Sequence, residues 1–307
     1  MHKNCYKEFK GICSVLPTPF RENEEFDYKG FEKIVKYQKQ NNVNTIFICG
    51  AGGEGPSISN EVRADSAKIA LENFKESPIS VGIFESGTKR TIDSIEFLIK
   101  NVDLEDRIIL TISPPVYFSP MHTRKEIVDF YREIGSIGIP IIAYSNPSYT
   151  GLKLDLETTK SLSQEENIIG MKFVKGSSEE LSQLRNELRR EFNIGFANRS
   201  PLLESLDIGA DVLVNSTASI IPGVFSELYK NYVKGDLKKA KHFEKEIRDF
   251  EEIFNIHKNY IAISKVSLNL LLGCGDYLTK PFEKLPYDLK EEVSKFLNSK
   301  KYLGLKI

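Results

Sequence analysis

Residues 139–172 read IPIIAYSNPSYTGLKLDLETTKSLSQEENIIGMK, in which two short apolar runs flank a longer polar stretch. Near-continuous apolarity over about five residues is typical of strands that are buried on both faces, as in a parallel sheet. The distance between the two runs fits one strand–helix unit. This stretch therefore predicts two neighbouring parallel strands at Ile139–Tyr144 and Ile168–Lys172.

The same alternation continues on both sides of this stretch. Six more apolar runs predict strands at Gly11–Leu16, Thr45–Gly50, Ile79–Phe84, Ile108–Ile112, Asn193–Ala197 and Asp211–Asn215. Between the runs, stretches such as Tyr28–Asn41, Thr91–Asn101 and Arg124–Ser136 have apolar residues at helical spacing. Eight such units predict a (β/α)₈ TIM barrel, a fold of about 250 residues. A doubly wound open sheet is the alternative, and it is less favoured because no GxGxxG follows the first run.

The strand pattern ends near Pro222, and only helical patterns follow it. The predicted helices are Val224–Lys234, Leu237–Asn255, Tyr260–Leu272 and Leu289–Ser299. We therefore assign residues 1–222 to the strands and helices of the barrel. Residues 223–307 would form the last barrel helix and a C-terminal helical region that packs on the barrel.

Composition narrows the function classes. Of the 307 residues, 42 are Lys or Arg and 43 are Asp or Glu, so a nucleic-acid-binding function is not favoured. No apolar run approaches the length of a membrane span, and the N-terminus lacks the apolar core of a signal peptide. The four cysteines form no CxxC pair and the four histidines no HExxH, so we expect no metal site and a cytoplasmic location.

In a barrel of this kind the active site lies where the strands end. Lys172 ends the sixth run, so its amine should point into the barrel mouth, where desolvation would lower its pKa. A neutral amine can attack a ketone to form a Schiff base. Tyr144 ends the fifth run, and its phenol could move protons. Taken alone, each residue is more often non-catalytic: a lysine that reaches water and a packed aromatic residue are the favoured interpretations.

Other strand ends supply further candidates. The glycine-rich loop Gly50–Gly55 could offer backbone amides to a carboxylate or could be a plain turn, and it lacks the GK[ST] of a phosphate-binding loop. Tyr117 follows a double proline, which stiffens its loop. Arg199 could hold a carboxylate in a bidentate manner, or it could be a solvated surface residue.

Taken together, these motifs resemble the family that contains dihydrodipicolinate synthase, N-acetylneuraminate lyase and the 2-keto-3-deoxy-sugar-acid aldolases. The likeness runs over nearly the whole chain and depends on the order and spacing of the motifs. They are LPTPF (16–20), GAGGE (50–54), ISNEVR (58–63), PVY (115–117), YSNPSYTG (144–151) and IGMK (169–172).

The resemblance implies a metal-independent class I aldolase or lyase without a cofactor, often a homotetramer, and here a homotetramer or homodimer. Its substrates would be a keto acid such as pyruvate and an aldehyde. The imine would form on Lys172, with Tyr144 as the proton relay and Tyr117 as a second tyrosine lent by a neighbouring subunit. The backbone at Ala51, Gly52 and Gly53 would hold the carboxylate of the keto acid.

Two departures from the family pattern affect the substrate prediction. The family loop usually carries two hydroxyl residues where this chain has Ala51 and Gly52, so an ordered water or Ser145 is our candidate to replace the lost hydroxyl. Dihydrodipicolinate synthases usually carry an arginine where this chain has Tyr149. The sequence therefore favours the sugar-acid aldolase branch, with Arg199 as a candidate for holding the acceptor. A 4-hydroxy-tetrahydrodipicolinate synthase and a non-catalytic keto-acid-binding barrel are the alternatives.

Overall fold

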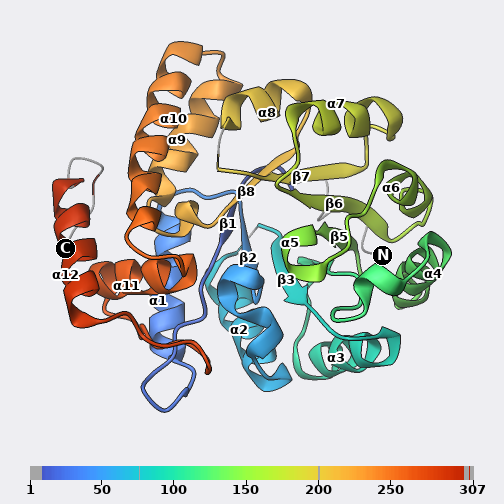
Figure 1. Ribbon diagram of the computed structural model, residues 1–307, viewed down its shortest axis with the longest axis horizontal. Helices are drawn as coiled ribbons and strands as arrows, with labels where there is room; N and C mark the ends of the chain where they lie inside the picture. The colour runs from blue at the N-terminus through green and yellow to red at the C-terminus, as the bar shows by residue number, and fades with distance from the viewer. Residues whose placement is uncertain (1–8, 76, 200, 301–303, 305–307) are drawn as a thin grey trace.

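The computed structural model describes residues 9–75, 77–199, 201–300 and 304, and its centre is a closed barrel of eight parallel strands. The strands follow one another around the barrel in chain order, and the eighth pairs with the first (Figure 1). They are β1 (Gly11–Val15), β2 (Thr45–Ile48), β3 (Ile79–Ile83), β4 (Ile108–Ile112), β5 (Ile141–Ser145), β6 (Ile168–Val174), β7 (Asn193–Ala197) and β8 (Val212–Asn215). The predicted (β/α)₈ barrel is confirmed.

Helices surround the barrel and cover its outer face (Figure 1). They are α1 (Tyr28–Gln40), α2 (Asn60–Asn73), α3 (Thr88–Asn101), α4 (Arg124–Gly135), α5 (Pro147–Thr150), α6 (Leu156–Leu162), α7 (Ser178–Glu187), α8 (Leu202–Ile208), α9 (Pro222–Val233), α10 (Leu237–Glu251), α11 (Tyr260–Leu272) and α12 (Tyr287–Ser299). The sequence analysis did not predict α2, whose buried face consists largely of alanine and polar residues. It also did not predict α5, α6, α7 and α8, which have four, seven, ten and seven residues. None of the helices in the described ranges is long and apolar enough to cross a membrane.

The strands are buried on both faces, and two apolar cores result. One core lies between the barrel and its helices, and the other fills the barrel interior. Alternate residues of a strand point to opposite faces, so Cys13 and Val15 of β1 lie inside while Ile12 faces the helices. Phe9 belongs to the interior core and precedes β1, at the amino end of the strands.

Strand β6 contains an irregularity that decides which way its side chains point. Ile141 pairs with Ile168, but Ile142 pairs with Gly170, so one extra residue enters β6. Ile169 belongs to the interior core, and strict alternation would turn Met171 inward as well. The extra residue reverses the alternation, and Met171 packs in the outer core. Lys172 therefore faces the interior beside Tyr144, its partner in the register.

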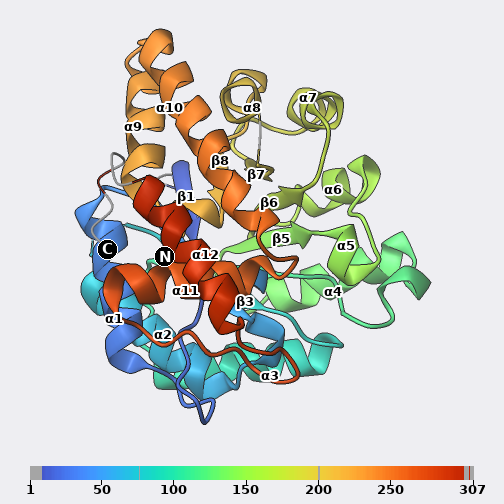
Figure 2. The same cartoon turned by 60° about the vertical axis from the view of Figure 1, so that its left-hand side comes forward.

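The C-terminal helices pack along one side of the barrel, where α11 contacts α1 and α12 lies against α11 (Figure 2). A buried ion pair joins this region to the loop after β2. The carboxylate of Glu54 pairs with the amine of Lys265 on α11, and both side chains are 1% exposed. The same carboxylate accepts hydrogen bonds from the amide of Thr279, at 2.7 Å, and from its hydroxyl, at 2.8 Å. The division into residues 1–222 and 223–307 stays a prediction.

Replacement of Lys265 by methionine should destabilise the fold. It leaves the Glu54 carboxylate buried without its cation, and removal of one partner of a buried pair costs about 3–5 kcal/mol. Urea unfolding followed by circular dichroism would measure the loss. Lys245→Met is the matched control because the pair of Lys245 with Asp249 is exposed to solvent. Equal urea midpoints for the two variants would contradict the role of the buried pair.

Candidate active site

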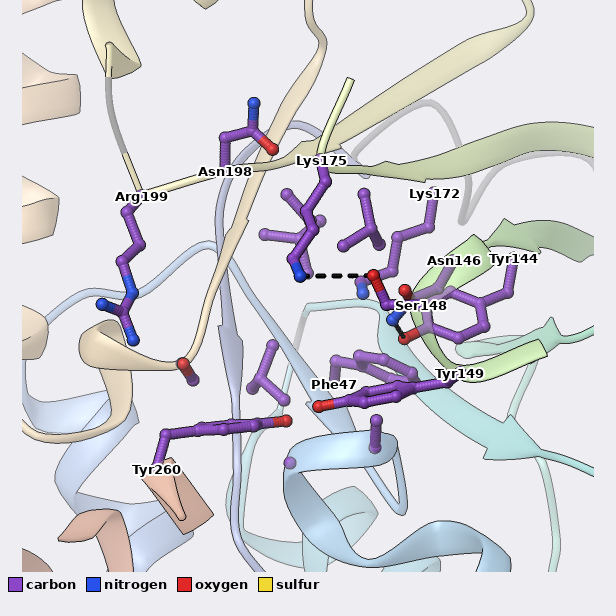
Figure 3. A pocket seen from close by; sticks show the side chains of 17 residues that line it. Phe47, Tyr144, Asn146, Ser148, Tyr149, Lys172, Lys175, Asn198, Arg199 and Tyr260 are labelled. Carbon is purple, nitrogen blue, oxygen red and sulfur yellow. Dashed lines mark hydrogen bonds between the residues drawn. The ribbon is translucent and has the colours of Figure 1, made fainter. Parts of the chain in front are cut away.

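A cavity of about 540 Å³ opens at the carboxyl end of the barrel strands (Figure 3). The residues that line it come from six of the eight strands, β1, β2 and β5–β8, with the loops that follow them, and from the start of α11. They are Val15, Phe47, Ala51, Gly52, Tyr144, Asn146, Ser148, Tyr149, Lys172, Val174, Lys175, Ala197, Asn198, Arg199, Val214, Ser216 and Tyr260. The cavity therefore brings together five of the predicted site residues: Lys172, Tyr144, Ala51, Gly52 and Arg199.

Lys172 lies at the inner end of this cavity and is only 8% exposed. Its amine is 4.3 Å from the ring centre of Tyr144 and 5.5 Å from that of Phe47. Burial disfavours the ammonium form and lowers the pKa of Lys172 to about 7. No Asp or Glu is among the lining residues in the described part of the chain. A substantial fraction of the amine is therefore neutral, and nucleophilic, at neutral pH.

Tyr144 lies next to Lys172 on the neighbouring strand. Its phenol accepts a hydrogen bond from the side-chain amide of Asn146 at 2.8 Å, and its ring packs edge-on against Phe84. Burial raises the pKa of Tyr144 well above the ordinary value, so the phenol is protonated at neutral pH. It can thus donate a proton close to the amine.

The loop after β2 turns sharply at the cavity wall. Ala51–Gly53 form one 3₁₀ turn, and Cys49 and Glu54 on either side of it have positive φ. Within the described ranges, the amides of Ala51 and Gly52 donate to no protein acceptor. Two unpaired amides in a turn of this kind can bind an anion such as a carboxylate.

Three predicted site residues lie outside the cavity lining. The hydroxyl of Ser145 faces away from the cavity and accepts a hydrogen bond from the amide of Leu154, because Ser145 alternates with the inward Tyr144. The carbonyl of Gly53 accepts a hydrogen bond from the hydroxyl of Thr18. Tyr117 is 84% exposed with a φ of +80°, and its role across a subunit interface stays a prediction.

The structure adds residues that the sequence did not single out as site residues. Lys175 follows β6 and could have been found by extending the search three residues past Lys172. No sequence pattern marked Tyr260 as a site residue, because it begins helix α11, about 90 residues after Lys172. In Figure 3 the hydroxyls of Tyr149 and Tyr260 point toward each other across the cavity. Burial, together with hydrogen bonding to Tyr149, raises the pKa of Tyr260.

The described residues contain no group of three or more His, Cys, Asp or Glu side chains placed to bind a metal. The fold and site define a class of protein: a closed (β/α)₈ barrel with a desolvated lysine at its mouth. Residues 8–300 match the model of the dihydrodipicolinate synthetase family, and the chain belongs to that family. It is therefore an enzyme, a carbon–carbon lyase of the Schiff-base pyruvate aldolase type.

Curated relatives cover nearly the whole chain. A 4-hydroxy-tetrahydrodipicolinate synthase of Brachyspira hyodysenteriae is 26% identical over 299 residues, which are 97% of this chain and 99% of the relative. The synthase of Kosmotoga olearia is 27% identical over 292 residues, which are 94% and 97% of the two chains.

Solved structures show the same fold. Dihydrodipicolinate synthase from Aquifex aeolicus matches with a TM-score of 0.86 at 21% identity and covers 97% of this chain and 100% of its own. A monomeric dihydrodipicolinate synthase variant matches with a TM-score of 0.87 at 23% identity, over 98% and 99% of the two chains.

The lowered pKa of Lys172 predicts a distinctive labelling profile. Because only the neutral amine reacts, acetylation of Lys172 by acetic anhydride should rise with pH up to about 7 and then level off. Lys89 is the internal control, since its ion pair with Asp93 raises its pKa above the ordinary 10.5. Its labelling should still rise at pH 10. Peptide mass spectrometry would follow both residues, and a parallel rise of the two up to pH 10 would contradict the desolvation of Lys172.

Proposed function

We propose that this enzyme makes or cleaves the bond between pyruvate and an aldehyde, with a 2-keto-3-deoxy sugar acid as the larger partner. The observation that carries the proposal is the buried amine of Lys172, which lies in an open cavity that no Asp or Glu of the described residues lines. Within that part of the chain, no ion pair holds this amine in its charged form. It can therefore serve as the nucleophile that forms an imine with a keto acid.

The chemistry follows from the placement of these groups. The neutral amine of Lys172 adds to the keto carbonyl, and the phenol of Tyr144 supplies a proton so that water can leave the carbinolamine. The resulting protonated imine accepts electrons, so the phenolate of Tyr144 can take a proton from the methyl group of pyruvate and an enamine forms. The enamine carbon attacks the aldehyde, whose oxygen takes that proton back from Tyr144, and hydrolysis then releases the product from the lysine. The amides of Ala51 and Gly52 would hold the pyruvate carboxylate throughout these steps.

The polar lining of the cavity supports a sugar-acid substrate. Hydroxyl and amide side chains surround the outer part of the cavity, and they can exchange hydrogen bonds with a polyhydroxylated chain. They belong to Asn146, Ser148, Tyr149, Asn198, Ser216 and Tyr260. The names of the relatives support the second candidate, 4-hydroxy-tetrahydrodipicolinate synthase. Tyr149, where the resemblance leads us to expect an arginine, is the observation against that candidate.

Borohydride trapping tests the proposal directly. With pyruvate present, reduction should fix an adduct on Lys172, because the imine is converted into a stable secondary amine. Peptide mass mapping would locate the adduct. Lys172→Met should abolish it, whereas Lys175→Met, a neighbouring cavity lysine without a comparable burial, should keep it. Failure to trap pyruvate or longer keto acids on Lys172 would leave the non-catalytic barrel as the better description.

A second arm of the experiment separates the two catalytic candidates. Enzyme that has not been treated with borohydride should condense pyruvate with polyhydroxylated aldehydes faster than with aspartate semialdehyde. The product can be followed by chromatography and by the loss of pyruvate. Preferential formation of the cyclised product of aspartate semialdehyde would instead favour the synthase.

The route of the proton is the next part of the proposal. Where the family loop usually carries a hydroxyl, this chain has Gly52, and a Cβ added there would lie 3.0 Å from Cγ1 of Val15 and 3.9 Å, an ordinary contact distance, from the hydroxyl oxygen of Tyr260. The phenol from α11 therefore reaches the position in the loop where the family hydroxyl is missing. We assign Tyr260, together with Tyr149, to the exchange of protons between Tyr144 and solvent.

Tyr260→Phe should therefore lower kcat by roughly 100-fold, the lower end of the range for loss of a proton-transfer group, with little change in KM for pyruvate. Steady-state kinetics and the pH profile of kcat would measure the effect. Tyr287→Phe is the control because Tyr287 is 77% exposed and does not line the cavity. Unchanged kcat for Tyr260→Phe would remove Tyr260 from the relay.

A further inference from the structure

Two cations other than Lys172 line the cavity, and both come from the loops that follow neighbouring strands. Lys175 follows β6, and Arg199 follows β7. Figure 3 shows both side chains extending into the cavity above Tyr149 and Tyr260. In the ranges that the structure describes, neither forms an ion pair, and no Asp or Glu lines the cavity with them. The outer part of the cavity is therefore electropositive.

Lys175 is held in a backbone conformation that lysine rarely adopts. Its φ is +57°, a left-handed conformation that costs a residue with a Cβ on the order of 1 kcal/mol. The loop is fixed from the neighbouring strand, since the side-chain amide of Asn198 donates to the carbonyl of Gly176 at 2.8 Å. The amine of Lys175 lies 3.2 Å from the hydroxyl of Ser148, a neutral partner that leaves its charge uncompensated. The left-handed turn at Lys175 thus directs its charged amine into the cavity.

Arg199 is oriented by the C-terminal region. The centre of its guanidinium lies 4.9 Å from the ring centre of Phe254. The carboxyl of Glu251 lies behind the cavity wall and accepts a hydrogen bond from the hydroxyl of Thr217 at 3.0 Å. Burial raises the pKa of Glu251 to about 7, so this carboxyl neutralises Arg199 only in part at neutral pH. The guanidinium stays available to an anion in the cavity.

We propose that Lys175 and Arg199 form a subsite for an anionic group, a carboxylate or a phosphate, at the far end of the acceptor aldehyde. This inference rests on the proposed aldolase function. The pyruvate carboxylate would occupy a different place, at the amides of Ala51 and Gly52. The preferred acceptor is then an aldehyde with its own acidic terminus, and the condensation product carries an acid at each end. A lysine and an arginine together suit either oxyanion, because one supplies a point charge and the other a planar fork.

Matched pairs of aldehydes test the subsite. Glyceraldehyde 3-phosphate is compared with glyceraldehyde, and succinic semialdehyde with butanal, each with pyruvate at saturation. The wild-type enzyme should show kcat/KM at least about tenfold higher for the anionic member of one pair, because a charge-assisted hydrogen bond contributes enough for such a factor. The pair with the larger ratio distinguishes phosphate from carboxylate as the ligand.

Variants link the preference to the two residues. Arg199→Gln and Lys175→Gln should each lower the ratio of anionic to neutral kcat/KM about tenfold, mainly through the KM of the anionic aldehyde. Lys153→Gln is the control, because Lys153 is paired with Glu180 outside the cavity and should leave the ratio as in the wild type. The subsite proposal is contradicted if the ratio of anionic to neutral kcat/KM is near one in the wild type. It is also contradicted if neither substitution lowers that ratio.

Pyruvate trapping with borohydride is carried out first on every protein, so that two kinds of failure are distinguished. Trapping without any preference for anionic aldehydes overturns the subsite and leaves the aldolase function in place. Absence of trapping in the wild-type enzyme overturns both proposals.

Discussion

The burial of both faces of the barrel strands is the constraint on which the rest of the structure depends. The interior is filled largely by its own apolar core, to which Phe9 belongs, and the polar strand side chains inside it, such as Ser80 and Thr111, bond to each other. The polar groups that are free to act on a ligand lie where the strands end. An amine at this boundary is surrounded by rings rather than by counter-ions, and this desolvation gives Lys172 its altered pKa.

A single extra residue in β6 makes that environment available to Lys172. Without the irregularity beside Ile142, the alternation set by Ile169 would turn Met171 inward and Lys172 toward the helices. The register also places Lys172 directly beside Tyr144. The nucleophile and the nearest proton donor are therefore neighbours because of strand pairing rather than because of a flexible loop, which keeps their geometry rigid.

The C-terminal region does more than cover the barrel. Through the pair of Lys265 with Glu54 it anchors the loop that presents the amides of Ala51 and Gly52. Its helix α11 also brings Tyr260 into the cavity. The two effects are coupled because Tyr260 and Lys265 lie on the same helix. A shift of α11 would move the phenol of Tyr260 and break the ion pair of Lys265 with Glu54 at the same time. The position of the loop with Ala51 and Gly52 and the position of Tyr260 in the cavity thus both depend on the packing of α11 against the barrel.

The sequence by itself determined the barrel, since burial on both faces leaves continuous apolar runs, and Ile108–Ile112 and Asn193–Ala197 were predicted with their observed bounds. It also predicted Lys172, Tyr144, Ala51, Gly52 and Arg199, which lie at strand ends and meet in the cavity. Only the tertiary structure decided that Ser145 faces away and that Tyr260 and Lys175 face the cavity. The physical reason is that side-chain direction depends on register and on the docking of distant helices, which leave no local pattern of residues.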